Sequence, residues 1–379
     1  MKFVVNRDLF SDAVSFVVKL LPARPTQPIL SGVVRDAADG GLSLSSFDYE
    51  VSSRTRVDAD VETPGAVLVQ GRILGDIANR LPQAPVEVEH DDAGVVIRCG
   101  QASFHLPTMP IEEFPSLPEV SGSSGTVPGQ DFAEAVSQVV VAASREDVAP
   151  VITGVNITLA PERLTLVATD RYRVAVRELP WRSDVEETRS VLVPARTLAE
   201  VGKSLGSAGA ITLTVVQQGE SELIAFTAGG KTVTSLLIKG SFPPVSRLFP
   251  SETPHYSVLS VSDVMDAVRR VQLVLDREAA LRFSFGPEGV ELEALGSEHA
   301  QASEQIDSVL NGEDIVVSLK PQFLLDGVGA LHAEFVRIAF TSNDTPGKPG
   351  PVLLTAQTSR DEGESVDYRY LLQPNLLMR

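Results

Sequence analysis

The amino-acid sequence predicts an α+β fold made of three tandem copies of one domain, each with two helices and about eight strands. A long amphipathic segment recurs twice, a shorter one recurs at nearly the same interval, and runs of alternating apolar residues lie between them. Chance does not readily produce two intervals that agree, so we interpret the chain as a threefold repeat. The domains are expected to cover residues 1–122, 123–252 and 253–379.

The first helix of each copy begins near an acidic residue and continues with apolar residues at helical spacing. In the first copy these apolar residues are Phe10, Ala13, Val14 and Val17. The equivalent alanine recurs after 122 and then 132 residues, at Ala13, Ala135 and Ala267.

The strands and the second helix of each copy follow in the same order. The runs "GLSLSSF", "RLTLVAT" and "GVELEAL" alternate in the way that predicts strands with one buried face. The second helices end at leucines that lie 124 and 126 residues apart, Leu81, Leu205 and Leu331. Because strands outnumber helices, the helices are expected to cover one face of the sheets. Turn-forming residues at 121–129 and 247–255 mark the domain boundaries.

The composition limits the classes of function. The chain holds 50 acidic and 32 basic residues, a net charge of −18, which argues against general attraction to nucleic acid but allows a local basic surface. No apolar run reaches about 18 residues, so no membrane span is expected. Asp8 interrupts any signal-peptide pattern, and Cys99 is the only cysteine, which excludes an intrachain disulfide and indicates the cytoplasm.

No motif supports catalysis or a cofactor. The segment "AGGKT" at 228–232 resembles a phosphate-binding loop, but Ala225 stands where that loop needs glycine, and both flanks alternate as strands. A hairpin turn is the better interpretation. The histidines have no metal-ligand spacing and are expected on the surface: His90, His105, His255, His299 and His332. We therefore predict a protein that is not an enzyme and that holds no metal.

Basic residues recur on or beside the repeated helices, while acidic residues crowd the loops and strands. This recurrence predicts a shared positive surface that faces phosphate, although each residue alone could be an ordinary solvated one. The predicted DNA-facing residues are Arg24, Arg72, Arg80, Arg145, Arg196, Lys203, Arg269 and Arg270. Arg145 is expected to end its helix.

Five motifs in order resemble the bacterial sliding clamp family, the β subunit of DNA polymerase III. They are "ARPTQPILSG", "FDYEVSSR", "PTMPIEEFPSLP", "ATDRYRVAVREL" and "GSFPPVSRLFP", and the resemblance covers essentially all 379 residues. The segments "SFDYEVS" and "ATDRYR" look most like the actinobacterial branch.

The resemblance implies a head-to-tail homodimer, a six-domain ring with helices around the hole. Such a ring encircles double-stranded DNA without sequence preference and gives the polymerase processivity. It implies that Phe104 of one subunit meets Leu273 of the other. The implied partners are the polymerase III alpha subunit, the clamp loader and other replication and repair proteins.

These partners bind through short apolar peptides in a groove, in which "TDRYRVAV" at 169–176 forms a border. Carried over by position, the groove consists of Ile152, Thr169, Arg171, Tyr172, Arg173, Val174, Pro243, Arg247, Leu248, Phe323, Gln373, Pro374 and Asn375. The alternative is an exposed strand end whose charges are solvated.

Two segments depart from the family pattern, and both fall on the groove. The chain ends "YLLQPNLLMR" where the family commonly ends like Met-Pro-Val-Arg-Leu, and Lys320 precedes Pro321 where Asn is usual. Drift is one explanation. The other is a specialised second clamp that resists groove-binding inhibitors, a form of antibiotic resistance. An enzyme with an unrecognised site and a monomeric adaptor are the rival functions.

Overall fold

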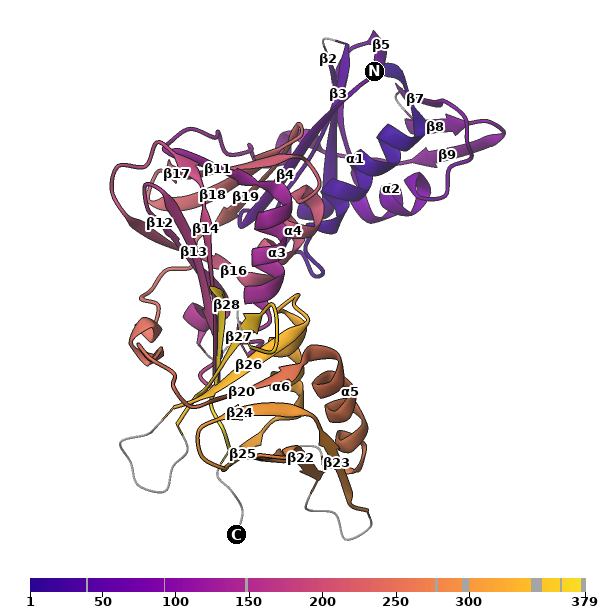
Figure 1. Ribbon diagram of the computed structural model, residues 1–379. Coiled ribbons are helices and arrows are strands. Elements are labelled where there is room, and N and C mark those ends of the chain that lie inside the picture. The colour runs from indigo at the N-terminus through magenta and orange to yellow at the C-terminus, as the bar shows by residue number, and fades with distance from the viewer. Residues whose placement is uncertain are drawn as a thin grey trace.

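The structure is a computed structural model that describes residues 1–38, 40–91, 93–146, 149–276, 279–294, 300–341, 350–361 and 363–375. The chain forms three similar domains along a crescent, with the sheets outside and the helices on the inner side of the bend (Figure 1). Within the described residues each domain has two α-helices and nine or ten strands. This confirms the predicted fold of two helices and about eight strands per domain, and two of the additional strands, at 108–109 and 182–183, are only two residues long.

The first domain begins with a strand and the long helix that the apolar spacing predicts. Its elements are β1 (Lys2–Val5), α1 (Arg7–Lys19), β2 (Gly32–Ala38), β3 (Gly41–Phe47), β4 (Val51–Asp58), β5 (Asp60–Thr63), β6 (Gly65–Gln70), α2 (Gly71–Ala78), β7 (Val86–Asp91), β8 (Gly94–Cys99), β9 (Ala102–Leu106) and β10 (Thr108–Met109).

The second domain repeats this order. Its elements are β11 (Ser124–Pro128), α3 (Gly129–Val140), β12 (Gly154–Leu159), β13 (Arg163–Thr169), β14 (Arg173–Pro180), β15 (Arg182–Ser183), β16 (Arg189–Pro194), α4 (Ala195–Leu205), β17 (Ala210–Gln218), β18 (Ser221–Ala228) and β19 (Lys231–Leu236).

The third domain repeats it again. Its elements are β20 (Tyr256–Ser260), α5 (Val261–Val271), β21 (Leu281–Gly286), β22 (Gly289–Ala294), β23 (Ala302–Ile306), β24 (Ser308–Asn311), β25 (Ile315–Leu319), α6 (Pro321–Gly329), β26 (Phe335–Phe340), β27 (Val352–Gln357) and β28 (Glu364–Leu372).

Local chemistry explains why the helices begin where they do. The Asn6 side chain accepts hydrogen bonds from the amides of Asp8 and Leu9, which caps α1, and the Asp8 carboxylate in the first turn suits the helix dipole. The four apolar residues predicted for its buried face are all buried. The "AGGKT" segment is the turn between the antiparallel strands β18 and β19, so the hairpin prediction is confirmed.

The sheets carry the threefold repeat in their strand order. The order β5-β1-β7-β8-β9 recurs as β15-β11-β17-β18-β19 and as β24-β20-β26-β27-β28. The second sheet of each domain has the orders β6-β2-β3-β4, β16-β12-β13-β14 and β25-β21-β22-β23. Three copies of one domain are therefore confirmed.

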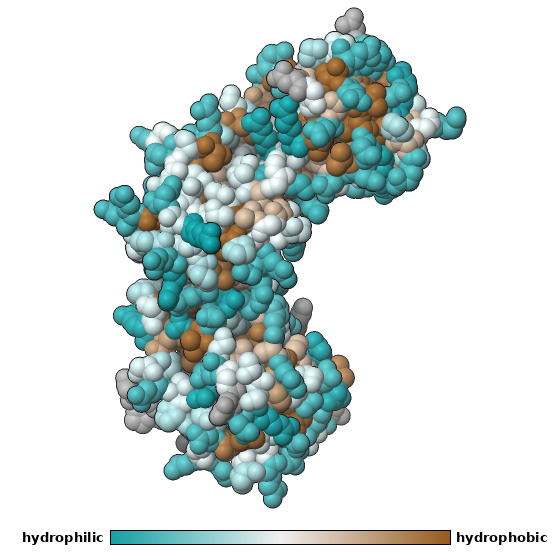
Figure 2. All heavy atoms as spheres, turned by 45° about the horizontal axis from the view of Figure 1, so that its top comes forward, coloured by the Kyte–Doolittle hydropathy of each residue, from teal (hydrophilic) through white to brown (hydrophobic). Residues whose placement is uncertain are grey.

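Neighbouring domains are joined through their backbones. The strand at the edge of each second sheet pairs antiparallel with the last strand of the next domain. β4 pairs with β19 in this way, and β14 pairs with β28. Each pairing merges two sheets into one of ten or nine strands. The described helices therefore all stay on the same side of the crescent, which the space-filling view shows as three lobes (Figure 2).

One residue inside the first domain works against its stability. Arg35 on β2 is completely buried, and none of its guanidinium nitrogens has a hydrogen-bond partner among the described residues. Its cross-strand neighbours are Leu44 and Val67. Burial lowers the pKa of Arg35 to about 9, because the interior disfavours the charged form.

We expect Arg35→Leu to raise the free energy of unfolding at pH 7 by roughly 2–4 kcal/mol, because it removes a buried charge without a partner. The folded-state pKa lies below the ordinary value of 12.5, so the penalty is complete below about pH 9 and shrinks as the pH rises toward 12.5. The gain should therefore be smaller at pH 10 than at pH 7. Denaturant unfolding at both pH values measures it.

The matched control is Arg54→Leu, which removes an exposed arginine from the nearby strand β4 and should change stability little. An Arg35→Leu protein no more stable than the parent at pH 7, or with the same gain at pH 10, would contradict this account.

Candidate functional site

The predicted basic residues lie on or next to the inner helices, and all eight are exposed. Arg24 lies in the loop after α1, where Arg72 from α2 donates hydrogen bonds to the Pro22 and Ala23 carbonyls. Arg145 differs from its prediction, because α3 ends at Val140 and Arg145 lies in the following loop. The small residues "AAS" at 142–144 lie between the end of α3 and Arg145. They continue the helical pattern of the sequence, which made the helix look longer than it is.

Four of these basic residues form exposed ion pairs with acidic neighbours. Their nitrogen–oxygen distances are 3.2 Å for Arg80–Asp76, 3.0 Å for Lys203–Glu200, 3.3 Å for Arg269–Asp266 and 2.9 Å for Arg270–Glu304. The hydrogen bond that Arg270 donates to the Glu304 carboxylate raises the pKa of Arg270. Exposed pairs contribute about 0–1 kcal/mol each, so a passing phosphate can replace the carboxylate at little cost.

The segment 169–173 forms a tight turn between β13 and β14. Asp170 accepts hydrogen bonds from the amides of Tyr172 and Arg173, both 3.1 Å long, and the Thr169 hydroxyl donates to the Arg173 carbonyl at 2.7 Å. Arg171 has a φ of 81°, in the left-handed region that a side chain rarely adopts. The turn leaves Tyr172 59% exposed, stacked on Phe323 of α6 at 6.3 Å between ring centroids.

Arg173 ties the second domain to the third. Its guanidinium donates hydrogen bonds to Asp170 at 2.8 Å, to Asp326 at 2.6 Å and to the Tyr370 hydroxyl at 3.1 Å, and it lies 4.3 Å from the Phe323 ring centroid. Burial alone would lower the pKa of Arg173, but the Tyr370 and carboxylate contacts outweigh burial and raise it. Because the Arg173 guanidinium is occupied by these contacts, its role is to hold the turn at 169–173 in position against the third domain.

A hollow of about 710 Å³ opens beside this turn, between the second and third domains. It brings together five of the predicted groove residues, Ile152, Arg171, Tyr172, Arg173 and Phe323. Lys320, one of the two departures from the family pattern that the sequence analysis places on the groove, also lines the hollow, and its Nζ lies 5.6 Å from the Phe323 ring centroid.

Three more predicted groove residues, Val174, Arg247 and Leu248, lie in or beside a second apolar cluster. Val174 belongs to a buried apolar cluster that we name the outer cluster: Val174, Val176, Ala339, Leu353 and Leu371, with Val167, Val245, Phe249 and Tyr256 packed against it. The 3-10 helix Val245–Leu248 contains Arg247 and leaves Leu248 exposed. Sequence reasoning missed Leu371, because its position opposite Val174 depends on the pairing of β28 with β14.

The chain end runs past the turn. The Gln373 amide donates to the Tyr172 carbonyl at 2.8 Å, Pro374 is buried, and the Asn375 amide donates to the Ser318 carbonyl at 2.8 Å. The altered tail therefore contacts the turn directly, while its residues 376–379 lie outside the described residues.

Among the described strands at the sheet edges, β9 and β23 lie at opposite ends of the crescent and are the counterparts of the strands that pair at the domain junctions (Figure 1). By strand order β9 is the equivalent of β19 and β28, and β23 is the equivalent of β4 and β14. β9 carries Phe104, and Leu273 lies in the 3-10 helix Gln272–Val274 after α5, 81% exposed. The first domain also shows the widest hydrophobic area in Figure 2.

Among the described residues no group of three or more His, Cys, Asp and Glu side chains could hold a metal ion. His299, one of the histidines expected on the surface, lies outside the described residues. No described helix is both long and apolar enough to cross a membrane.

Comparison with known proteins gives matches along the whole chain. Family models for the DNA polymerase III beta subunit match in order: the N-terminal domain over residues 1–118, the central domain over 126–244 and the C-terminal domain over 246–353. The beta sliding clamp of Streptomyces coelicolor is 42% identical over 376 residues, 99% of each chain. The beta sliding clamp homolog GriR of Streptomyces muensis is 39% identical over 375 residues, again 99% of each.

A solved structure has the same fold. The crystal structure of a DnaN sliding clamp (DNA polymerase III subunit beta) from Pseudomonas aeruginosa, bound to griselimycin, matches with a TM-score of 0.90 at 24% identity and covers 100% of both chains.

Proposed function

The chain belongs to the DNA polymerase III beta subunit family, the bacterial sliding clamps, with relatives of the actinobacterial type, and from this premise we propose that two copies close head to tail around double-stranded DNA. The ring would hold the replicative polymerase on its template and so give it processivity. The chain itself would act without a catalytic site, a metal or a cofactor, in the cytoplasm. We divide it into functional domains at 1–122, 123–252 and 253–379.

The free edges of β9 and β23 are the observation that best supports a ring. Inside the chain, both domain junctions use the same pairing: the edge strand of a second sheet, β4 or β14, pairs with the last strand of the next domain, β19 or β28. Repeating that operation joins β23 of one subunit to β9 of its partner, and the partner's β23 to the first subunit's β9. Head-to-tail contacts of this kind close when the rotation per subunit permits. In such a ring Phe104 would meet Leu273 of the partner subunit.

The charge distribution fits retention by enclosure. A net charge of −18 discourages nonspecific attraction, while the eight predicted basic residues are exposed on or beside the helices that would face the DNA. Their contacts with phosphate would be exposed and screened by salt, which permits sliding.

The hollow beside Tyr172 and the outer cluster together would form the partner groove. Its occupants would be short apolar peptides of the polymerase III alpha subunit, the clamp loader and repair proteins. Two or three buried Leu- or Phe-sized side chains contribute about 1.5–3 kcal/mol each before entropic losses. That corresponds to roughly micromolar affinity, so partners could exchange on one ring.

We expect sedimentation of the purified chain to give about twice its mass of 40.5 kDa. Leu273→Glu should weaken the dimer about tenfold or more, because it places a charge in the apolar contact. Val366→Glu is the matched control, since Val366 is also exposed, at 58%, but lies on β28, away from the free edges. A stable species near 40 kDa for the unmodified chain would favour the monomeric adaptor.

We also propose that this clamp is a specialised second copy whose groove resists an inhibitor. The support is positional: Lys320 lines the hollow, and the altered tail bonds to the turn through Gln373. One relative is described as a clamp homolog, and a structurally similar clamp is bound to griselimycin. Drift at these positions remains the alternative.

Replacing residues 373–379 with a tail like Met-Pro-Val-Arg-Leu should raise the affinity for griselimycin about tenfold, because it restores the usual groove wall. Isothermal titration of the parent and the exchanged chain measures the effect. Lys320→Asn tests the second departure separately, and a Val366→Ala chain is the control that leaves the groove intact. Equal affinity of the parent and the exchanged chain removes the specialised-clamp hypothesis.

A further inference from the structure

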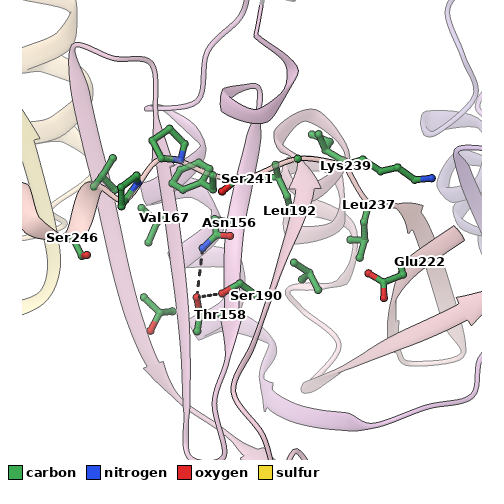
Figure 3. Close-up of a pocket in the computed structure, with 18 of the residues that line it drawn as sticks. Asn156, Thr158, Val167, Ser190, Leu192, Glu222, Leu237, Lys239, Ser241 and Ser246 are labelled. Atoms are coloured by element: carbon green, nitrogen blue, oxygen red, sulfur yellow. Dashed lines mark hydrogen bonds between the residues drawn. The ribbon is translucent and has the colours of Figure 1, made fainter.

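A second hollow, of about 840 Å³, lies on the outer face of the second domain (Figure 3). The strands β12, β13 and β16 form its floor, and the segment 237–246, which leads to the third domain, crosses above it. We name this segment the connector. Of the predicted groove residues only Pro243 lines this hollow, so the proposed function leaves the rest of it unused.

The floor combines hydroxyl groups with apolar side chains in two rows. Cross-strand pairing aligns Ser190, Thr158 and Thr165 in one row, and Leu192, Asn156 and Val167 in the next. The Thr158 and Ser190 hydroxyls are 2.9 Å apart, and Figure 3 shows them at the centre of the floor. A surface of this kind suits an extended peptide, which needs both apolar contact and hydrogen bonds.

The connector is fixed above the floor. The Ile238 amide donates to the Leu192 carbonyl at 2.8 Å, and Gly240 has a φ of 137° and no room for a side chain, since a Cβ there would lie 2.5 Å from Val151 Cγ1. In the described part of the chain the amides of Lys239, Ser241 and Phe242 donate to no backbone carbonyl. These amides therefore have no backbone carbonyl as acceptor within the described chain and are available to a bound peptide.

The hollow is continuous with the outer cluster of the proposed groove. Val167 lies opposite Val176 across the β13–β14 pair, and Val176 belongs to that cluster. Val167 and Val245 line the hollow and also pack against the cluster. A peptide anchored on the cluster can enter the hollow without leaving the protein surface.

The far end of the hollow is acidic. Glu220 and Glu222 line it, with Glu222 paired to Arg189, while Lys239 points away from the floor in Figure 3. A basic side chain at the end of a bound segment would complement Glu220.

We propose that this hollow is an additional subsite for partner peptides, which takes the extended segment flanking the apolar motif. The subsite would favour a flank with hydroxyl and β-branched residues next to the apolar motif and Lys or Arg beyond them. This proposal rests on the proposed groove. Partners with such a flank would bind more tightly than partners that carry the apolar motif alone, so the subsite would rank partners that compete for one ring.

The test uses fluorescence anisotropy with the full-length chain and three labelled peptides. The short peptide holds two leucines and a phenylalanine, and the two long peptides add Arg-Ser-Val-Thr before it or Thr-Val-Ser-Arg after it, so that in both the arginine lies at the end far from the apolar motif. We expect one long peptide to bind about tenfold more tightly than the short one. Ser190→Arg, at an exposed floor position, should abolish this gain and leave the short peptide's affinity unchanged. Ser207→Arg adds the same charge at an exposed position that does not line the hollow and should preserve the gain.

The outcomes separate the two proposals. If the short peptide does not bind, the groove itself is wrong and this subsite is overturned with it. If the short peptide binds but neither long peptide gains affinity, or the gain survives Ser190→Arg, only the additional subsite is overturned.

Discussion

Backbone pairing between domains is the interaction on which the rest of this structure depends. β4 and β14 would each be the free edge of a sheet, and an unpaired edge readily pairs with another chain. Each is completed instead by the last strand of the following domain, so the junctions are as regular as the sheets themselves. Because one pairing rule sets both junctions, the helices stay on one side and the crescent curves in one direction (Figure 1). The same rule leaves β23, the counterpart of β4 and β14, and β9, the counterpart of β19 and β28, without such a partner in the described chain.

The groove is a consequence of the same junction. The pairing of β14 with β28 places Leu371 beside Val174, and Arg173 reaches Asp326 and Tyr370 across the boundary. The turn at 169–173 therefore exposes Tyr172 from a well-anchored base, which would lower the entropic cost of the proposed peptide binding. The strongly acidic chain does not conflict with DNA encirclement, because a closed ring needs no net attraction to stay on its substrate.

The sequence predicted the parts that depend on local periodicity. Helix α1 with its buried face and the hairpin at 228–232 follow from the pattern within one segment, and the threefold repeat follows from the intervals at which such segments recur. The motif resemblance also drew together Ile152, Tyr172 and Phe323, which the structure places around one hollow. Their roles in binding remain predictions.

The parts that the sequence did not predict depend on contacts between distant segments. The run "GVVRDAADG" does not indicate that Arg35 faces the interior without a partner, since arginine side chains are normally exposed. The hollow under the connector exists only because Ile238 bonds to Leu192 and because β12 pairs in one register with β13 and β16. No local pattern encodes that register.

The most direct test of enclosure is loading onto a circular plasmid with a clamp loader, followed by gel filtration before and after a single cut. The account predicts that the protein stays with the intact circle, leaves the linear molecule, and remains when bulky proteins block both ends. Retention on linear DNA with free ends would show that the chain grips DNA by direct contact, and would contradict a ring that holds by enclosure.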